Sequence, residues 1–371
     1  MRIGITGASG FVGRNLQWRL REAGHTDVQL ISHQASDAEL IQQLTGLDFV
    51  FHLAGVNRPK DPIEFENGNA GFSLRLASIL RSLPGKRPPV AFASSTQATL
   101  DNAYGRSKRA AEDALLDYQR QCRVPVYIFR LTNVFGKWCR PNYNSVVATF
   151  CHNIARDLPV KINDPDAPLR LVYIDDVLTK MLALLGPTPP EPGFVDVEPA
   201  YDTTVGELAA TLQRFRATRD SLMTERVGTG LTRALYATYV SYLPQEAFAY
   251  AVPRHVDPRG TFVEMLKTPD CGQFSYFTAG PGVTRGEHYH HTKTEKFLVI
   301  KGSARFEFRQ IDTGETHELV THGGEARIVE TIPGWTHNIT NIGDDELIVM
   351  LWANEVFDRA RPDTTAMKVK P

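Results

Sequence analysis

The spacing of apolar residues changes once along this chain of 371 residues, close to residue 245. Before that point, short apolar runs alternate with longer segments in which apolar residues recur every three or four positions. After it, short runs of alternating character follow one another, with turn residues between them. Strands that alternate with helices form parallel sheets covered by helices, whereas strands alone form barrels or sandwiches. We therefore expect two domains of different class.

The first domain, residues 1–245, is expected to be an α/β Rossmann-type doubly wound parallel sheet. Its predicted strands are residues 2–6, 28–31, 48–55, 90–95 and 126–130, and its predicted helices are residues 12–23, 66–82, 104–121 and 205–215. Ser36 and Glu39 have the spacing of a capping box that opens a further helix. The Pro-rich stretch 187–199 is interpreted as a loop inside this domain.

The second domain, residues 246–371, is expected to be an all-β barrel or double-sheet jelly roll. Its short strands are predicted in the segments FLVIKG, ARFEFRQI, HELV, ARIVETI and LIVMLWA. The boundary is placed within residues 241–260, because this stretch contains scattered prolines and ends in a glycine.

Composition narrows the class of protein. The formal net charge of −1 argues against a nucleic-acid partner and against a polybasic membrane patch. The apolar runs are shorter than a transmembrane helix, and no signal-peptide pattern precedes the first strand. The four cysteines lack a CxxC spacing, which is typical of reduced thiols: Cys122, Cys139, Cys151 and Cys271. We expect a cytoplasmic protein that acts on a small molecule.

A glycine-rich loop joins the first predicted strand to the first predicted helix. Gly7, Gly10 and Gly13 allow a tight turn and a close approach of backbone N–H groups to a pyrophosphate, next to the positive end of the helix dipole. Phe11 and Val12 complete the loop. The sequence therefore predicts a dinucleotide site here.

The residues after the second predicted strand indicate which dinucleotide is bound. An NAD site usually places Asp or Glu there to hold the ribose 2′-hydroxyl, but this chain has Ser32, His33 and Gln34. Arg14 follows the last glycine of the loop. We therefore expect NADPH, with Arg14 and His33 as candidate contacts of its 2′-phosphate.

Tyr104 and Lys108 are four residues apart, so they share one face of their predicted helix. A neighbouring lysine favours the phenolate and lowers the tyrosine pKa, so the tyrosine can exchange a proton with a carbonyl or carbinol oxygen. The strand before this helix ends at Ser94, Ser95 and Thr96, which offer a hydroxyl group to orient that oxygen.

These features resemble the extended short-chain dehydrogenase/reductase family over about the first 245 residues. The resemblance is carried by HLAG (52–55), the Ser95 region, Tyr104 with Lys108, RLTNVFG (130–136) and VYIDDV (172–177). It implies a catalytic triad of Ser95, Tyr104 and Lys108, with Ser94 or Thr96 as alternatives for the hydroxyl. It also implies cofactor contacts at Leu53, Ala54, Gly55, Tyr104 and Lys108, and sugar-nucleotide contacts at Asn133, Asn142, Tyr143, Asn144 and Ser145.

A second set of residues has the character of a metal site. His288 and His290 point to the same face of a strand, whereas His291 points away, and Glu295 and His337 come from later strands. Three imidazoles and a carboxylate suit Zn²⁺ and also Fe²⁺, Mn²⁺ or Ni²⁺. The spacing of these residues between Gly282 and Gly302 resembles the first cupin motif. His337 and Asn341 fit a second cupin motif more loosely, because its proline lies one position nearer the histidine than usual.

The whole chain resembles the family of bifunctional capsular-polysaccharide enzymes of the UDP-N-acetyl-L-fucosamine pathway. The segments that carry this resemblance are LAGVNRPK (53–60), FGKWCRPNYNSVVATFCHNIAR (135–156), YATYVSYLP (236–244), DPRGTFVEMLKTPDCGQ (257–273) and EHYHHTKTEKFLVIKG (287–302). It implies C3 epimerisation of UDP-2-acetamido-2,6-dideoxy-4-hexulose in a zinc cupin, followed by NADPH-dependent C4 reduction. The product would be UDP-2-acetamido-2,6-dideoxy-L-talose. We expect a homodimer, because cupin domains often pair edge to edge.

Three other functions remain open on the sequence. They are a simple 4-ketosugar reductase whose cupin is structural, a non-catalytic NADP-binding scaffold, and a metal-dependent dioxygenase fused to a dehydrogenase. The acid or base of the epimerisation is also not assigned, and Tyr289, Lys296 and His322 are polar candidates near the motif.

Overall fold

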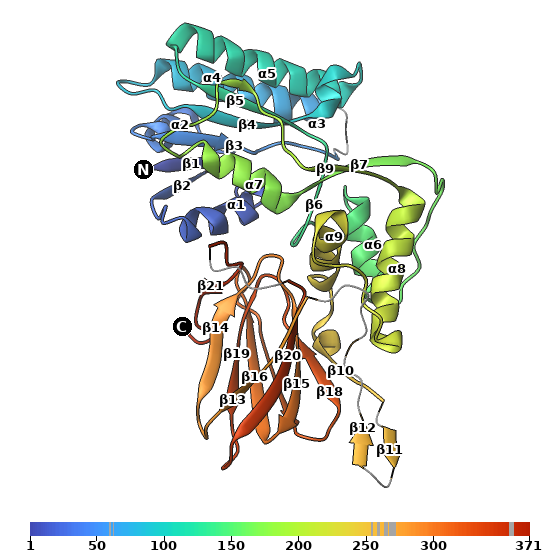
Figure 1. The fold of residues 1–371 in the computed structure, drawn as a ribbon. Coiled ribbons are helices and arrows are strands. Elements are labelled where there is room, and N and C mark those ends of the chain that lie inside the picture. The colour runs from blue at the N-terminus through green and yellow to red at the C-terminus, as the bar shows by residue number, and fades with distance from the viewer. Residues whose placement is uncertain are drawn as a thin grey trace. The chain divides into compact units, whose positions relative to one another are not determined.

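The computed structural model in Figure 1 describes residues 1–58, 61, 63–253, 255–257, 260–262, 266, 272–355 and 360–371. Cys271 and much of the segment 257–273 lie outside the described residues. The chain forms two compact units, one of residues 1–145 with 169–202 and one of residues 146–168 with 203–371. The expected division of the two activities at residue 245 stays a prediction.

The first unit contains a six-stranded parallel sheet in the order β2-β1-β3-β4-β5-β8, which confirms the predicted fold class. Its strands are β1 (Ile3–Thr6), β2 (Val28–Ile31), β3 (Phe49–His52), β4 (Val90–Ser95), β5 (Val126–Leu131) and β8 (Gly193–Phe194). A smaller sheet joins β6 (Asn133–Phe135), β7 (Pro168–Tyr173) and β9 (Ala200–Thr204). The helices are α1 (Phe11–Glu22), α2 (Asp37–Leu44), α3 (Ile63–Phe65), α4 (Phe72–Ser82), α5 (Ala103–Cys122) and α7 (Ile174–Ala183).

Local chemistry explains several boundaries in this unit. The predicted capping box is confirmed, since the Ser36 side chain accepts from the Glu39 N–H and the Glu39 carboxylate accepts from the Ser36 N–H. The helix expected from residue 66 begins instead as a π-helix, Glu66–Gly71, which continues into α4. The strand predicted to reach residue 55 ends at His52, because the next two N–H groups bond to the side chain of Thr6.

The second unit contains two five-stranded antiparallel sheets, in the orders β10-β18-β15-β20-β13 and β17-β16-β19-β14-β21, as the prediction of a double sheet requires. The first of these sheets has β10 (Ala249–Ala251), β13 (Gln273–Ala279), β15 (Glu295–Lys301), β18 (Arg327–Glu330) and β20 (Leu347–Ala353). The second has β14 (Thr284–Tyr289), β16 (Ser303–Gln310), β17 (Thr316–His322), β19 (Trp335–Asn341) and β21 (Thr365–Ala366). The unit also includes α6 (Val146–Ile154), α8 (Val205–Ser221), α9 (Gly230–Val240) and a hairpin of β11 (His255–Asp257) and β12 (Gly260–Phe262).

The two sheets pack face to face through aromatic rings. The ring centres of Phe297 in β15 and Phe306 in β16 are 5.7 Å apart, and Phe297 also contacts His337 in β19. Across the described parts of both units, no helix is both long enough and apolar enough to cross a membrane.

Candidate active sites

The glycine loop lies where the order of the parallel strands reverses. The chain passes from β1 to β2 on one side and then to β3 on the other, so the loops that follow β1 and β3 meet at the crevice where such sheets bind nucleotides. Gly7 has a φ of 67°, and a Cβ there would lie 2.6 Å from the amide nitrogen of Ala54. A Cβ on Gly13 would lie 2.3 Å from the carbonyl oxygen of Gly7. Both positions therefore require glycine.

The first turn of α1 is suited to an anion. Its N-cap, Gly10, makes no side-chain capping hydrogen bond, and no acidic residue follows in that turn. The positive end of the helix dipole is therefore not neutralised locally, and the N–H groups around Phe11 and Val12 are available to an anion. The Arg14 guanidinium stacks over the ring of Trp138 at 5.6 Å, and burial lowers the pKa of Arg14.

The other predicted cofactor residues border the same crevice. Leu53 and Ala54 donate their N–H groups to the Thr6 hydroxyl, at 3.1 and 3.2 Å. Gly55 lies against Lys108, since a Cβ on Gly55 would be 3.1 Å from Nζ of Lys108. His33 is exposed after β2, and its ring packs edge-on against Phe72. The contacts of Arg14 and His33 with a 2′-phosphate stay predictions.

Tyr104 and Lys108 lie on the first two turns of α5, whose N-cap, Asn102, accepts a hydrogen bond from the N–H of Gly105 at 2.7 Å. The Tyr104 hydroxyl donates to Oδ1 of Asn57 at 3.1 Å. Lys108 is buried and donates to the carbonyl oxygen of Ala93 at 3.0 Å. The ammonium of Lys108 is 5.9 Å from the centre of the Tyr104 ring.

The predicted lowering of the Tyr104 pKa is wrong for this structure. Burial raises the pKa of Tyr104, and a hydrogen bond with Ser95 only partly opposes it. Burial also lowers the pKa of Lys108 to about 8, although the negative charge of Glu112, one helical turn further along α5, partly opposes this shift. At neutral pH Tyr104 is therefore protonated, which is the form that donates a proton to a ketone oxygen.

The three candidate hydroxyl residues differ in what they contact. Ser94 is buried and donates to the carboxylate of Glu112, which also accepts two hydrogen bonds from Arg130, at 2.7 and 3.0 Å. Ser95 is half-buried and bonds to Tyr104. Thr96 is exposed. The geometry favours Ser95 as the catalytic hydroxyl, because the Ser94 hydroxyl already donates to Glu112.

Sequence reasoning did not single out two asparagines of this site. Asn57 accepts the hydrogen bond from Tyr104. Asn69 lies in the π-helix, exchanges hydrogen bonds with the backbone of Val56 and donates to Ser107, beside Lys108. The π-helix is the structural sign of such a position, since π-turns are frequent at functional sites, but no sequence pattern predicted it.

The predicted sugar-nucleotide residues fall on two segments. Asn133 is exposed in β6 and donates to the carbonyl oxygen of Arg170 at 3.1 Å. The segment between β6 and α6 holds the other four predicted residues, namely Asn142, Tyr143, Asn144 and Ser145. The Tyr143 ring lies under the guanidinium of Arg140. Their role in binding stays a prediction.

The structure brings the four predicted metal ligands together. One ligand atom from each of His288, His290, Glu295 and His337 lies within 4.8 Å of the others. His290 Nε2 and His337 Nε2 lie 3.2 and 3.5 Å from the same carboxylate oxygen of Glu295. All of them are buried except His288, which is half-buried. His291 lies outside the cluster, where its ring packs against Tyr289.

The protonation of this cluster fits a divalent metal. Nδ1 of His288 and of His290 bonds to the carbonyl oxygens of Gly286 and Asp363, so Nε2 is left as the lone-pair donor. Burial and the neighbouring imidazoles lower the pKa of His288 to about 4. Burial alone would raise the pKa of Glu295, but His290 and His337 hold it well below its ordinary value. Neutral imidazoles and an ionised carboxylate are the forms that bind metal.

A C-terminal strap, residues 360–370, fixes the metal-bearing segment. β21 pairs with the end of β14, opposite His288 and Tyr289. The Asp363 carboxylate accepts hydrogen bonds from the N–H groups of residues 291, 292 and 293, at 2.9, 2.6 and 2.8 Å. The Asp363 carbonyl bonds to His290. Asp363 therefore orients the loop between two metal ligands, although it lies 73 positions after His290.

Replacing Asp363 with alanine should weaken metal binding by about 10–100-fold, the usual cost of losing a partner that orients a ligand. The reason is that three backbone N–H groups beside His290 lose their common acceptor. A competition titration with a chelator measures the affinity. Asp345→Ala is the control, because Asp345 is exposed and pairs with Lys301. Unchanged affinity in Asp363→Ala would contradict the positioning role.

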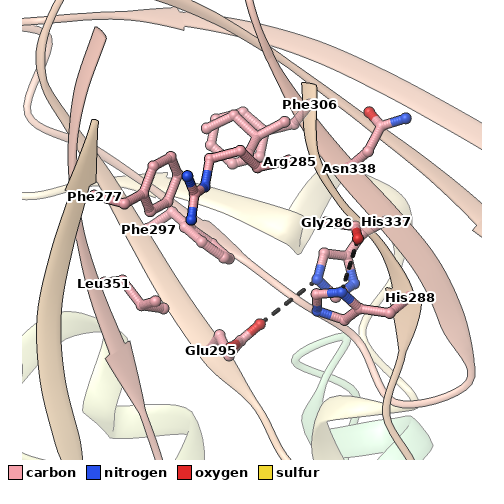
Figure 2. A pocket seen from close by; sticks show the side chains of 11 residues that line it. Phe277, Arg285, Gly286, His288, Glu295, Phe297, Phe306, His337, Asn338 and Leu351 are labelled. Carbon is pink, nitrogen blue, oxygen red and sulfur yellow. Dashed lines mark hydrogen bonds and ion pairs between the residues drawn. The ribbon is translucent and has the colours of Figure 1, made fainter. Parts of the chain in front are cut away.

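Three residues of the metal cluster, His288, Glu295 and His337, line a cavity of about 190 Å³ between the two sheets. Figure 2 shows these three residues facing an aromatic wall and a guanidinium, which come from Phe277, Phe297, Phe306 and Arg285. None of the three polar candidates for the epimerisation lines this cavity among the described residues. Lys296 is buried and ion-paired with Glu330, Tyr289 is buried, and His322 is exposed and bonds to Ser303.

Comparisons with known proteins match two parts of the chain to two families. Residues 3–192 match the NAD dependent epimerase/dehydratase family, and residues 255–365 match the polysaccharide biosynthesis C-terminal domain. Over 369 residues the chain is 57% identical to UDP-2-acetamido-2,6-beta-L-arabino-hexul-4-ose reductase of Pseudomonas aeruginosa. The match covers 100% of this chain and 99% of that relative.

The chain also resembles solved structures. The capsular polysaccharide assembling protein CapF from Staphylococcus aureus is 41% identical, and the match covers 100% of both chains with a TM-score of 0.67. The UDP-glucose 4-epimerase of Thermus thermophilus in complex with NAD is 20% identical, with a TM-score of 0.51 over 58% of this chain and 84% of that chain. The second likeness shows a shared fold alone.

Proposed function

The chain belongs to the NAD dependent epimerase/dehydratase family, and we propose that it is a bifunctional enzyme of capsule or O-antigen sugar synthesis. It epimerises C3 of UDP-2-acetamido-2,6-dideoxy-4-hexulose in the two antiparallel sheets of the second unit. We call these sheets the β-domain and assign them as a cupin. The enzyme then reduces C4 with NADPH. The observation that carries this proposal is that a Ser95–Tyr104 pair and a three-histidine, one-carboxylate cluster occur in one chain, each in a site of its own. The product is UDP-2-acetamido-2,6-dideoxy-L-talose, a precursor of UDP-N-acetyl-L-fucosamine.

Reduction at C4 uses the residues at the end of β4 and the start of α5. A bound nicotinamide supplies the hydride. Ser95 donates a hydrogen bond that orients the C4 oxygen, and Tyr104, protonated at neutral pH, gives that oxygen its proton. Buried Lys108 adds positive charge beside Tyr104 and Gly55, where we expect it to bind the nicotinamide ribose. We prefer NADPH to NADH because Ser32, His33 and Gln34, rather than a carboxylate, directly follow β2, and because Arg14 lies in the first turn of α1.

Epimerisation at C3 uses the β-domain cavity. His288, His290, Glu295 and His337 would hold a divalent metal, and Zn²⁺ fits this donor set. Such a metal would polarise the C4 ketone and so acidify the neighbouring C3 proton. Phe277, Phe297 and Phe306 would place apolar side chains against the sugar ring. Subsequent reduction traps the new configuration, because an alcohol at C4 no longer enolises.

Proton NMR of the UDP-linked 4-keto sugar in D₂O tests this function. We expect deuterium to enter C3 without NADPH, and a single reduced talo product to form after NADPH is added, with NADH a poorer donor. Reduction without exchange at C3 would favour the second candidate, a simple 4-ketosugar reductase with a structural β-domain. We also expect a cytoplasmic homodimer that binds neither nucleic acid nor membrane.

A further inference from the structure

The metal-bearing strand is interrupted by a β-bulge between Gly286 and His288. In a regular strand, side chains alternate between faces, so Arg285 and His288, three positions apart, would point to opposite faces. With the bulge, Arg285 pairs with Ile339 and His288 pairs with His337. All four side chains line the same cavity. The bulge therefore brings a guanidinium to the face that carries the metal ligands.

Specific contacts hold this bulge in place. Glu287, the extra residue, has a φ of 58°. Its carboxylate accepts a hydrogen bond from Asn338 at 2.9 Å and another from the N–H of Val369 in the strap at 2.8 Å. A Cβ on Gly286 would lie 2.8 Å from the carbonyl oxygen of His337, so only glycine fits there. Bulges of this kind occur next to active sites, where they redirect a side chain.

Arg285 has the environment of a group that receives an anion. It is exposed at the cavity and stacks over Phe277, with 5.0 Å between the guanidinium carbon and the ring centre. No carboxylate among the described residues forms an ion pair with it. Figure 2 shows the Arg285 guanidinium beside Phe277 and Phe297, on the side of the cavity away from His288.

The size of the cavity decides which part of a nucleotide sugar it can enclose. Pockets that enclose a drug-sized ligand measure about 300–1,000 Å³, and this one measures about 190 Å³. A single sugar ring fits such a space, but a nucleoside diphosphate does not. When the ketone of that ring faces the metal ligands, the diphosphate must lie at the opening.

We propose that Arg285 is a substrate-binding residue that holds the diphosphate of the UDP-sugar, while the sugar ring lies against Phe297 and Phe306 beside the metal ligands. This inference rests on the proposed function, since it names how that substrate enters the epimerising cavity. The planar guanidinium matches phosphate oxygens with two parallel hydrogen bonds, and its stacking on Phe277 limits its rotation.

Deuterium exchange at C3, measured with full-length metal-loaded enzyme and no NADPH, tests the role of Arg285. Arg285→Ala should raise the KM for exchange about 10–100-fold with a small change in kcat, as expected for the loss of a hydrogen-bonded charge pair. Arg285→Lys should lie between Arg285→Ala and the wild type, because lysine keeps only the charge. Arg305→Ala is the matched control, since Arg305 lies on β16 and does not line the cavity.

Two results would overturn this assignment. One is an unchanged KM in Arg285→Ala, and the other is a fall in kcat at unchanged KM. Calorimetric titration with UDP separates these results from a failure of the proposed function. We expect Arg285→Ala to bind UDP about 10–100-fold more weakly than the wild type at one site per chain. If the wild type showed no exchange, the epimerase proposal would fail, and an unchanged UDP affinity at every site of Arg285→Ala would independently reject Arg285 as the diphosphate contact.

Discussion

Replacing Tyr104 with phenylalanine should lower the rate of NADPH-dependent reduction by about 10²–10⁴-fold, the range that a positioned acid contributes. Burial keeps the Tyr104 hydroxyl protonated at neutral pH, and Asn57 and Ser95 hold it in place. Phenylalanine retains the ring that packs against Phe65 but has no proton to give. The measurement is NADPH oxidation at saturating UDP-linked 4-keto sugar.

The control for this variant lies on the same helix. Tyr118→Phe removes a hydroxyl that donates to the carbonyl oxygen of Pro88, so it should cost about 1 kcal/mol of folding free energy and leave the reduction rate unchanged. Deuterium exchange at C3 should continue in Tyr104→Phe at the wild-type rate. A Tyr104→Phe enzyme that reduced the sugar within a few-fold of the wild-type rate would show that another group supplies the proton.

Much of the fold could be read from the sequence because its signals are local. The positions of β1, β2, β4 and α5 follow from apolar periodicity, and the glycines at 7, 10 and 13 occupy the strand-to-helix turn that their spacing predicts. The metal cluster also follows from spacing, because His288, His290 and Glu295 lie within eight positions and His337 occurs on a neighbouring strand.

The features that were missed depend on contacts between distant segments or on burial. Asp363 acts on a loop about 70 positions earlier, and no local pattern links the two. The bulge at Glu287 shifts the strand register by one residue, so that Arg285 lies on the same face as His288. The simple alternation of side chains along a strand does not predict this placement. The predicted lowering of the Tyr104 pKa was wrong because the spacing to Lys108 indicates that the two side chains are close, but not that Tyr104 is buried.

Replacing His290 with alanine should abolish C3 exchange while leaving C4 reduction of a 3-epimerised substrate intact. His290 and His337 both face the same oxygen of Glu295, so removing one imidazole leaves an incomplete and partly uncompensated ligand set. Metal affinity should fall by more than the about 10–100-fold expected for loss of an orienting partner. The matched control is His317→Gln, because His317 is half-buried on β17 and does not line the cavity.

Metal content, C3 exchange and NADPH oxidation are measured on the same preparations. If His290→Ala lost metal but kept exchange, the epimerase step would not depend on the cluster. If reduction of the 3-epimerised substrate fell together with exchange, the two activities would not be separable, contrary to the assignment of each to its own site.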